Sequence, residues 1–491
     1  MDELIPLSAA TLHTLDPRIT VPTYDRSAVR PGILHVGLGN FHRAHQALYL
    51  DDLMTRGEGL DWGILGAGVM PGDARMRADL EAQDWLFTVL EQDADTEAAR
   101  ISGAMTGFVP VTPDHEAIRA ALRDPAIRIL SLTVTEGGYF LDAAGSPDLD
   151  HAALRADIAA PDQPGTVFGA IVAGLRDRRA AGAAPFTVMC CDNLPHNGSV
   201  TRRLVAGIAR EQDAGLGDWI DAEVAFPNSM VDRITPATTP ARAALLSDSY
   251  GLQDTRPVFC EPFRQWVLED HFTDGRPPLE QVGVEFVTDV APFETMKIRI
   301  LNGGHAIIAY PSSLLGIEYA HEAMAHPLVS AFFDKVEREE VLPVVPDVPG
   351  TSTSDYLTLI RRRFANPRVE DTTDRICFDG SNRQPKFIVP SVRDNLARGG
   401  PVAGLALASA LWCRYCMGHN EAGQPIAPND PDWDNLTMRA NRAREDPEIW
   451  LSMDDVYGDV AEDVRFGSAF ADALEQLITK GTAATLKTYL S

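Results

Sequence analysis

The stretch from Gly32 to Leu50, GILHVGLGNFHRAHQALYL, decides the fold because two structural periodicities meet in it across a pair of glycines. GILHV is a short apolar run that predicts a buried strand, and RAHQALYL has the spacing of a helix. Between them lies Gly37-x-Gly39, a turn that lets a pyrophosphate approach the backbone and bind helix N–H groups. His42 replaces the third glycine of this fingerprint, so a plain turn that packs a helix on a sheet is the alternative.

Strand-like runs continue through the first half of the chain and alternate with helical patterns, at 62–69, 128–134, 186–191, 222–226 and 282–290. This alternation predicts βαβ units and a parallel sheet with both faces covered. Beyond Pro292, amphipathic helical patterns dominate. We therefore expect an α/β protein with a Rossmann-like NAD-binding domain over residues 1–285 and a mainly α-helical substrate-binding and catalytic domain over residues 286–491.

The composition limits the possible partners. The chain has 43 Lys and Arg against 70 Asp and Glu, a net charge of −27, which argues against binding nucleic acid or an anionic membrane surface. Six cysteines without a framework of spacings favour a reducing compartment. The N-terminus has no basic segment followed by an apolar run, and no apolar stretch approaches the length of a membrane span. We expect a cytoplasmic protein.

Asp73 follows the second strand-like run, where a carboxylate would accept hydrogen bonds from a ribose diol and repel a 2′-phosphate. This position favours NAD over NADP. The alternative is that Asp73 caps a helix after Pro71 and Gly72.

A second stretch, FETMKIRILNGGHAIIAY from Phe293 to Tyr310, has the chemistry of an active site. Taken as a regular helix, it places Glu294, Lys297, Asn302 and His305 on one side of a richly apolar segment. A solvated face is the alternative. A buried lysine is costly unless it is paired or deprotonated, and desolvation lowers its pKa toward the range of a general base. The adjacent glycines 303 and 304 would let a substrate or a nicotinamide ring approach the backbone.

A further polar cluster follows the strand-like run at 186–191, at the edge where α/β sheets bind ligands. Asn193 and Asn302 both carry amide groups that can donate hydrogen bonds to an oxygen that gains negative charge. A turn-forming role is the alternative for Asn193. Asp232 lies among apolar residues, either as a partner of Arg233 or as a modulator of the base.

Six motifs together resemble one enzyme family: GLGNFHRAHQA, TVTEGGY, CDNLPHNG, MVDRITP, EPFRQWVLED and MKIRILNGGH. The family is that of the polyol-specific long-chain dehydrogenases, and the likeness is strongest to its mannitol 2-dehydrogenases. The resemblance covers nearly the whole chain and weakens after about residue 400. It implies a monomeric, NAD-dependent and metal-independent enzyme that oxidises a hexitol to a 2-ketose and catalyses the reverse reduction, with D-mannitol and D-fructose as the preferred pair.

The resemblance also assigns roles to individual residues. Lys297 is the general base, Asn193 and Asn302 form an oxyanion hole, and His305 orients the substrate. The implied substrate contacts are Asp232, Glu294, Arg375, Arg383 and Lys386. The implied cofactor contacts are Gly37, Gly39, Asn40, Phe41, Asp73, Thr135 and Glu136.

Two positions depart from the family pattern. Arg383 stands where the mannitol enzymes can carry lysine, and Gly72 stands where they can carry a second acidic residue. Within the family, the alternatives are D-arabinitol or sorbitol oxidation and the reduction of fructuronate, whose carboxylate the basic residues would bind. Outside it, the alternative is a nucleotide-binding sensor on the same scaffold.

Three further motifs have plainer explanations. Cys413, Cys416 and His419 lack the four-ligand spacing of a structural zinc site, so a buried helix face is expected. His42 and His45 are expected to cap or line the cofactor pocket rather than bind metal. The run VEREEV at 336–341 is expected to be a solvated helix face.

Overall fold

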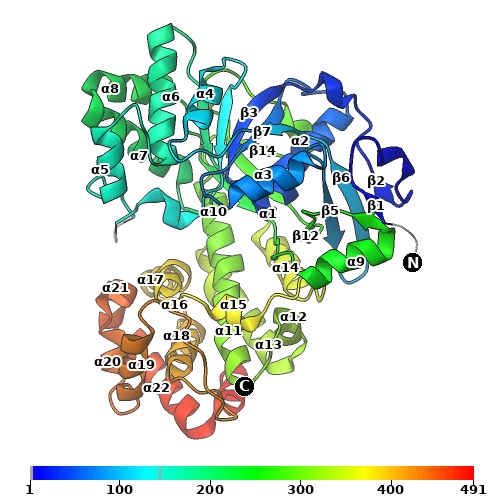
Figure 1. The fold of residues 1–491 in the computed structure, drawn as a ribbon. Helices are drawn as coiled ribbons and strands as arrows, with labels where there is room; N and C mark the ends of the chain where they lie inside the picture. Colours follow the sequence, from blue (N-terminus) through cyan, green and yellow to red (C-terminus); the bar gives the residue numbers. More distant parts are fainter. Residues whose placement is uncertain (1–3, 143–144) are drawn as a thin grey trace. The chain divides into compact units, whose positions relative to one another are not determined.

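A computed structural model describes residues 4–142 and 145–491 of the chain. The chain divides into two compact units, Met1–Ala291 and Pro292–Ser491 (Figure 1). The division falls between residues 291 and 292, a few residues beyond the boundary expected from the sequence.

The first unit is built around a five-stranded sheet in the order β7-β4-β3-β8-β9, with every neighbouring pair parallel. The strands are β3 (Pro31–Val36), β4 (Gly63–Ala67), β7 (Met105–Phe108), β8 (Ile129–Leu132) and β9 (Thr187–Cys190). Side chains alternate between the faces of a strand, and on β3 Leu34 and Val36 join one apolar cluster while Ile33 joins another. Both faces of the sheet are therefore covered, and the predicted α/β class is confirmed.

Helices of the first unit follow the strands as βαβ units require. They are α1 (Asn40–Ala44), α2 (Gln46–Thr55), α3 (Asp73–Glu81), α4 (Glu116–Arg123), α5 (Ala152–Ala159), α6 (Val167–Ala181), α7 (Asn197–Gln212), α8 (Ala214–Glu223) and α9 (Pro240–Tyr250). Helices α5 to α8 pack against one another beside the sheet (Figure 1).

Three smaller sheets complete the first unit. One has the order β12-β5-β6-β2, with β5 (Phe87–Gln92) antiparallel to β6 (Glu97–Ser102) and with β2 (Ile19–Thr20) and β12 (Val258–Cys260) at its edges. The second joins β10 (Ser229–Asp232), β13 (Gln265–Glu269) and β14 (Glu285–Val287). The third pairs β1 (Ile5–Pro6) with β11 (Leu252–Gln253).

The strand expected at 222–226 was a wrong prediction. Helix α8 extends to Glu223, and Ala225 accepts a single backbone hydrogen bond, from the amide of Val188 at 3.0 Å. The side chains at 224–226 are buried, so their apolar character reflects packing in the core rather than membership of a sheet.

The second unit is helical, as expected for this half of the chain. Its main helices are α11 (Gly303–Leu314), α12 (Ala320–Ala325), α13 (Pro327–Val336), α14 (Thr353–Phe364), α15 (Thr373–Cys377), α16 (Gly380–Phe387), α17 (Val389–Arg398), α18 (Ala403–Cys416), α19 (Trp433–Arg442), α20 (Glu448–Leu451), α21 (Asp454–Tyr457), α22 (Val464–Lys480) and α23 (Thr482–Leu490). Helix α11 packs against α13, α15 and α18, and is thus central to the unit.

The run VEREEV is only in part the solvated face that its charges predict, because Arg338 and Glu339 are exposed but the two other glutamates are buried. Its residues Glu337–Val341 form a π-helical segment, η6, in which Glu337 is fully buried and Glu340 is 1% exposed. The Glu340 carboxylate accepts hydrogen bonds from the amides of Gly404 and Leu405 at the start of α18, at 2.7 and 2.8 Å. Neither carboxyl oxygen of Glu337 has a hydrogen-bond partner among the described residues.

Glu337 makes the stability of the protein depend on pH. Burial raises its pKa well above the ordinary value, so the folded state holds a proton that the unfolded state releases above its own pKa of 4.5. The contribution of protonated Glu337 to the free energy of unfolding is therefore fully present below pH 4.5 and is lost as the pH rises toward the pKa of Glu337 in the folded state. We expect Glu337→Gln to become steadily more stable than the wild type over this range, by about 1.4 kcal/mol for each pH unit. Denaturant unfolding at a series of pH values measures the difference.

Glu340→Gln is the matched control for this prediction. The backbone amides of Gly404 and Leu405, which donate to the two oxygens of Glu340, would face a side-chain amide with only one acceptor oxygen. This variant should therefore lose stability at every pH. A difference between wild type and Glu337→Gln that does not change with pH would contradict the assignment of a buried neutral carboxyl group.

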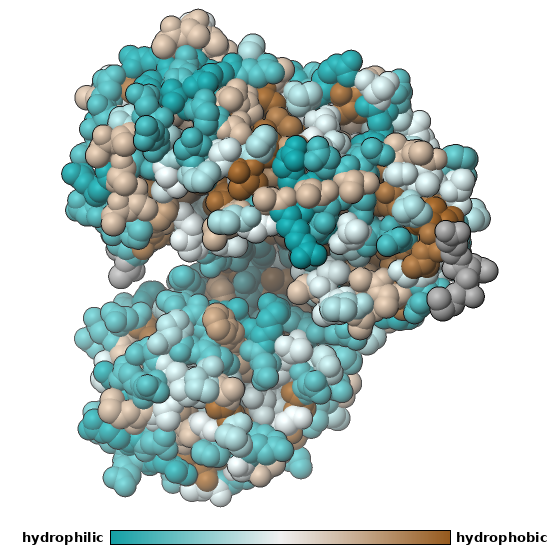
Figure 2. Space-filling model, in the orientation of Figure 1, coloured by the Kyte–Doolittle hydropathy of each residue, from teal (hydrophilic) through white to brown (hydrophobic). Residues whose placement is uncertain are grey.

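The surface of the protein is mostly polar, as expected for a chain with many charged residues. The face in Figure 2 is mostly hydrophilic, with apolar residues scattered over it. The large apolar side chains that the described residues expose are Leu4, Met70, Leu245, Phe378, Met438 and Val464. Among the described residues, no helix has both the length and the apolar character that a membrane span requires.

Candidate active site

The glycine turn after β3 has the geometry of a phosphate-binding turn. Gly37 has φ +94°, and a Cβ there would lie 2.1 Å from the carbonyl oxygen of Thr133, so the position requires glycine. A Cβ at Gly39 would meet only the Gly37 carbonyl, at 3.9 Å. Gly39 is exposed and leaves the backbone open to a ligand. The turn therefore fits a dinucleotide pyrophosphate at the carboxyl edge of the sheet.

A buried arginine that the sequence reasoning missed holds the turn in place. Arg43 is 1% exposed and donates to the carbonyl of Gly39 at 3.4 Å and to Asn40 Oδ1 at 2.7 Å. Burial lowers the pKa of Arg43 to about 10, which leaves it charged at neutral pH. A positive charge behind the turn favours an anionic cofactor. The buried position of this arginine next to a glycine turn has no signal in the sequence.

The two nearby histidines, expected to cap or line the cofactor pocket, make no side-chain cap bond to α1 or α2. His42 stacks on His35 with ring centroids 3.4 Å apart, and its Nδ1 lies 2.6 Å from Gln46 Oε1. His45 Nε2 lies 2.8 Å from the carbonyl of Gln265. Burial lowers the pKa of both His42 and His45 to about 3. These rings are neutral parts of the core, because α1 and α2 turn them inward.

Asp73 lies at the start of α3, directly after the turn that leaves β4. Its Oδ2 accepts hydrogen bonds from the amides of Val69 and Met70, both at 2.9 Å. The carboxylate thus closes this turn, and no side-chain cap bond is formed at the start of α3. Gly72 has open space where a Cβ would stand, so nothing in the fold requires glycine at this departure from the family pattern.

Three more predicted residues follow β8 and β9 at the same edge of the sheet. Thr135 and Glu136 follow β8, and Asn193 follows β9. Asn193 Nδ2 donates to Glu136 Oε1 at 3.4 Å, so the structure brings these two residues together. Thr135 has φ +68° and ψ 158°, a conformation that residues other than glycine rarely adopt and that clusters at functional sites.

Asp232 and Phe41 are also placed within the first unit. Asp232 ends β10 and is 5% exposed. Its neighbour Arg233 donates to Glu91 and to the carbonyls of Ala44 and Glu261. Phe41 is half-buried and stacks on His45, with ring centroids 4.9 Å apart.

The lysine-bearing stretch in the second unit is an interrupted helix. A π-helical segment, η5 (Lys297–Asn302), separates α10 (Ala291–Met296) from α11. The regular helix expected here was therefore wrong over these six residues, because each π turn takes an extra residue and rotates the following side chains. Such segments occur frequently at functional sites. Lys297 is 8% exposed and Glu294 is 7% exposed, which confirms the expected burial.

The adjacent glycines serve packing rather than ligand access. A Cβ at Gly304 would lie 2.8 Å from Phe333 Cε2 and 3.3 Å from Glu337 Oε1, and one at Gly303 would lie 3.2 Å from the carbonyl of Phe387. Both positions face protein atoms of the second unit. The close approach of neighbouring helices explains why glycine is found here, and the expected opening for a ligand was wrong.

Asn302 and His305 contain buried polar atoms with unused hydrogen-bonding capacity. Among the described residues, Asn302 Oδ1 and His305 Nε2 have no hydrogen-bond partner. The His305 ring stacks on Phe364 with centroids 4.1 Å apart, and its Nε2 lies 3.8 Å from Asp371 Oδ2. Burial, more than the nearby Asp371, controls the pKa of His305 and lowers it to about 3. The imidazole is therefore neutral and can exchange hydrogen bonds with a hydroxyl group.

The basic residues of the second unit lie beside this histidine or on nearby helices. Arg375 pairs through two nitrogens with the carboxylate of Asp371. Arg383 donates to the carbonyl of Ile376 at 2.9 Å, and Lys386 is exposed on α16. The structure thus connects His305, Asp371 and Arg375 in one cluster.

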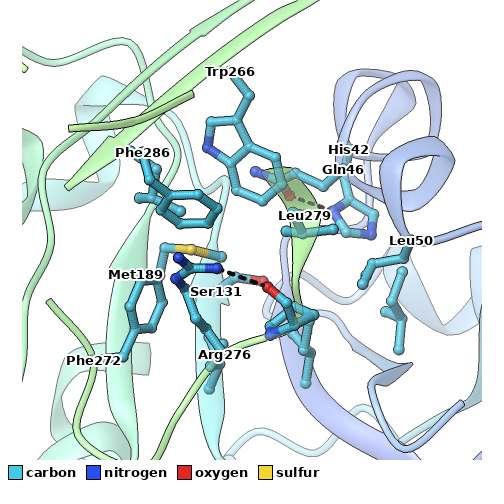
Figure 3. Close-up of a pocket in the computed structure, with 15 residues that line it drawn as sticks. His42, Gln46, Leu50, Ser131, Met189, Trp266, Phe272, Arg276, Leu279 and Phe286 are labelled. Atoms are coloured by element: carbon cyan, nitrogen blue, oxygen red, sulfur yellow. Dashed lines mark hydrogen bonds between the residues drawn. The ribbon is translucent and has the colours of Figure 1, made fainter. Parts of the chain in front are cut away.

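An apolar cavity in the first unit is a separate feature. It lies between the sheet and α2, and Figure 3 shows His42 and Gln46 near Trp266 and Leu279 in its wall. Its volume is about 10 Å³, which is room for one water molecule at most. A six-carbon polyol does not fit there.

Cysteine and histidine side chains do not form a metal centre in the part of the chain that the structure describes, where no group of three potential ligands occurs. Cys413 and Cys416 are buried on α18, which confirms the predicted helix face.

A glycine turn at the carboxyl edge of a parallel sheet, followed by a helical unit with a buried lysine, asparagine and histidine, defines the class of two-domain nicotinamide-dependent dehydrogenases. Residues 31–281 match the Mannitol dehydrogenase Rossmann domain, and residues 289–478 match the Mannitol dehydrogenase C-terminal domain. The chain belongs to the mannitol dehydrogenase family, and the resemblance seen in its sequence motifs is confirmed.

Similar proteins extend over the full length of the chain. A mannitol 2-dehydrogenase of Cereibacter sphaeroides is 60% identical over 96% of this chain and 99% of its own. The structure of Pseudomonas fluorescens mannitol 2-dehydrogenase in a ternary complex with NAD and D-mannitol has a TM-score of 0.89 at 41% identity and covers 99% of each chain. A D-sorbitol dehydrogenase structure has a TM-score of 0.90 at 34% identity, over 98% of this chain and 100% of its own.

Proposed function

We propose that the protein oxidises a hexitol at C2 with NAD and catalyses the reverse reduction of a 2-ketose, with D-mannitol and D-fructose as the preferred pair. The observation that supports this most directly is the interrupted helix of the second unit. It carries Lys297, Asn302 and His305 in a chain of the mannitol dehydrogenase family. NAD, when bound, accepts the hydride that leaves C2.

Lys297 accepts the proton of the C2 hydroxyl group. Its amine lies on a largely buried segment, which suits a general base because the neutral amine is favoured away from water. The proton moves to the lysine nitrogen, the electron pair that it leaves on oxygen forms the C=O π bond, and the C2–H bond breaks as its electron pair leaves with the hydride. This step requires no metal ion and no covalent intermediate.

Two asparagines stabilise the oxygen while it carries negative charge. Asn193 and Asn302 each donate an amide hydrogen to it, which favours the transition state over the neutral alcohol. His305, neutral through burial, holds a neighbouring hydroxyl group and orients the carbon chain. Asp232 binds the sugar chain, and Glu294, one helical turn before Lys297, connects the base to solvent.

The basic residues of the second unit contact the distal hydroxyl groups. Arg375, Arg383 and Lys386 are the candidates, and Arg375 is already fixed by its pairing with Asp371. On the nucleotide side, Gly37, Gly39, Asn40 and Phe41 hold the pyrophosphate end, and Asp73, Thr135 and Glu136 hold the riboses. We further propose that the protein acts as a monomer in the cytoplasm.

A substrate panel tests this function. Purified protein should reduce NAD with D-mannitol faster than with sorbitol or D-arabinitol, should prefer NAD to NADP, and should keep its rate after treatment with EDTA. The sorbitol arm is essential because a D-sorbitol dehydrogenase has the same fold. Preferential NADH oxidation with fructuronate would favour the hexuronate reductase. Failure to turn over any polyol or ketose, with NAD still bound, would support the sensor alternative.

A further inference from the structure

A buried carboxylate joins the two loops that carry Thr135, Glu136 and Asn193. Asp192 is the second residue after β9 and is 7% exposed. Its Oδ1 accepts a hydrogen bond from the amide of Thr135 at 2.8 Å. Its Oδ2 accepts hydrogen bonds from the amide of Val134 at 3.0 Å and the hydroxyl of Tyr139 at 2.6 Å, and a longer one from the Cys190 thiol at 3.9 Å. Three residues of the loop after β8, Val134, Thr135 and Tyr139, are thus held by the residue next to Asn193.

The bond to Thr135 falls on the strained point of that loop. Thr135 has φ +68° and ψ 158°, in a region of backbone conformation that is nearly restricted to glycine. A β-branched residue keeps such a conformation only where its surroundings impose it. Asp192 supplies that constraint through the Thr135 amide, and the strained backbone in turn sets the direction of Thr135 and Glu136.

The backbone of Asp192 is also held by hydrogen bonds. Its carbonyl oxygen accepts hydrogen bonds from Asn197 Nδ2 at 3.0 Å and from the amide of Leu194 at 2.9 Å. Asn197 also donates to the carbonyl of Ser229 at 2.8 Å. These hydrogen bonds hold the backbone of the turn that contains Asn193. The side chain of Asn193 then donates from Nδ2 to Glu136 Oε1 at 3.4 Å.

We propose that Asp192 is a positioning residue for the reaction, which holds the Thr135–Glu136 segment and Asn193 in one fixed arrangement. The role rests on the proposed function, because these loops carry the groups for the cofactor and the reacting oxygen. In this role Asp192 contacts neither the cofactor nor the reacting oxygen, and it acts by holding the residues that do. Errors of about 1 Å in the placement of such groups reduce rates by about 100-fold, so the fixed arrangement matters for catalysis as well as for folding.

The chain contains a matched control for a purely structural role. Asp157 is 1% exposed and also accepts hydrogen bonds from two backbone amides and one hydroxyl group, those of Gly165 and Thr166. It serves a loop that contains none of the predicted site residues. Asp157→Asn therefore reports what the loss of one such carboxylate does to the fold alone.

The experiment compares Asp192→Asn with Asp157→Asn. An asparagine at 192 can keep its oxygen toward Val134 and Tyr139, but its NH₂ group then faces the Thr135 amide, and that bond is lost. We expect both variants to unfold at lower temperature, and only Asp192→Asn to lower kcat by about 10- to 100-fold and to weaken NAD binding. Rates and NAD dissociation constants are measured well below both unfolding temperatures. Asp192→Asn values within twofold of those of Asp157→Asn would overturn the proposal.

Tyr139→Phe keeps the test decisive where Asp192→Asn does not fold. It removes one donor to Asp192 and leaves both backbone bonds, so we expect a fall of severalfold in kcat and in NAD affinity. Unchanged values would overturn the proposal. NAD binding is measured without a polyol, so an enzyme that oxidises no hexitol would refute the proposed function while the affinity comparison still tests Asp192.

Discussion

Replacing Lys297 with alanine should lower kcat by about 10²- to 10⁴-fold, the usual range for the loss of a general base. Lys297 lies on the π-helical segment and is 8% exposed as a residue, so we expect bulk water to replace it poorly as a proton acceptor. The glycine turn proposed to bind the cofactor belongs to the other unit, so we expect NAD binding to change little. Steady-state kinetics at saturating substrate, together with NAD titration, measures the two effects separately.

Lys335→Ala is the matched control for this prediction. Lys335 is a half-buried lysine of the same unit that donates to the carbonyl of Tyr489 at 2.9 Å, so its loss should affect stability and leave kcat unchanged. Added small primary amines should restore part of the activity of Lys297→Ala, because they can occupy the space of the missing side chain. A variant that keeps most of its turnover would remove Lys297 from the mechanism.

The first unit shows how far its fold can be predicted from sequence. Strands β4, β8 and β9 lie within the apolar runs expected for them, and β3 begins one residue before its run, because a parallel strand covered on both faces needs a nearly continuous apolar run. The run at 222–226 is buried at 224–226 but forms no strand, and the Ala225 carbonyl accepts one backbone hydrogen bond, from the Val188 amide of β9. Burial can therefore be predicted from such a run, whereas pairing depends on distant strands.

The second unit shows a different limit. The burial of Lys297 was predictable from its apolar neighbours. The π-helical segment that begins at this lysine was not, because its residue types do not distinguish a π helix from an α helix. The same holds for Glu337, whose charged neighbours predicted exposure, although η6 places it against Gly304. Arg43 was missed because its buried position depends on contacts with distant residues such as Arg256, and Asp192 was missed because its partners lie in the loop after β8.

Asn302→Ala should lower kcat by about 10²- to 10³-fold, as the loss of one oxyanion donor usually does. Asn302→Asp should be worse, because a carboxylate would repel the alkoxide that the amide stabilises. Asn193→Ala should have an effect of the same order, and the double variant should lose less than the product of the single losses if both amides serve one oxygen.

The stability of Asn302→Ala separates a catalytic asparagine from a structural one. Asn302 Oδ1 is buried without a hydrogen-bond partner among the described residues, so the variant should unfold no earlier than the wild type. Asn395, fully buried in the same unit, instead donates to the carbonyls of Glu340 and Ser391. Asn395→Ala should cost about 1–3 kcal/mol of stability and leave kcat unchanged. If Asn302→Ala lost as much stability as Asn395→Ala and kept its turnover, Asn302 would be a structural residue. A group that is arranged to stabilise the transition state can be removed without lowering the stability of the ligand-free protein.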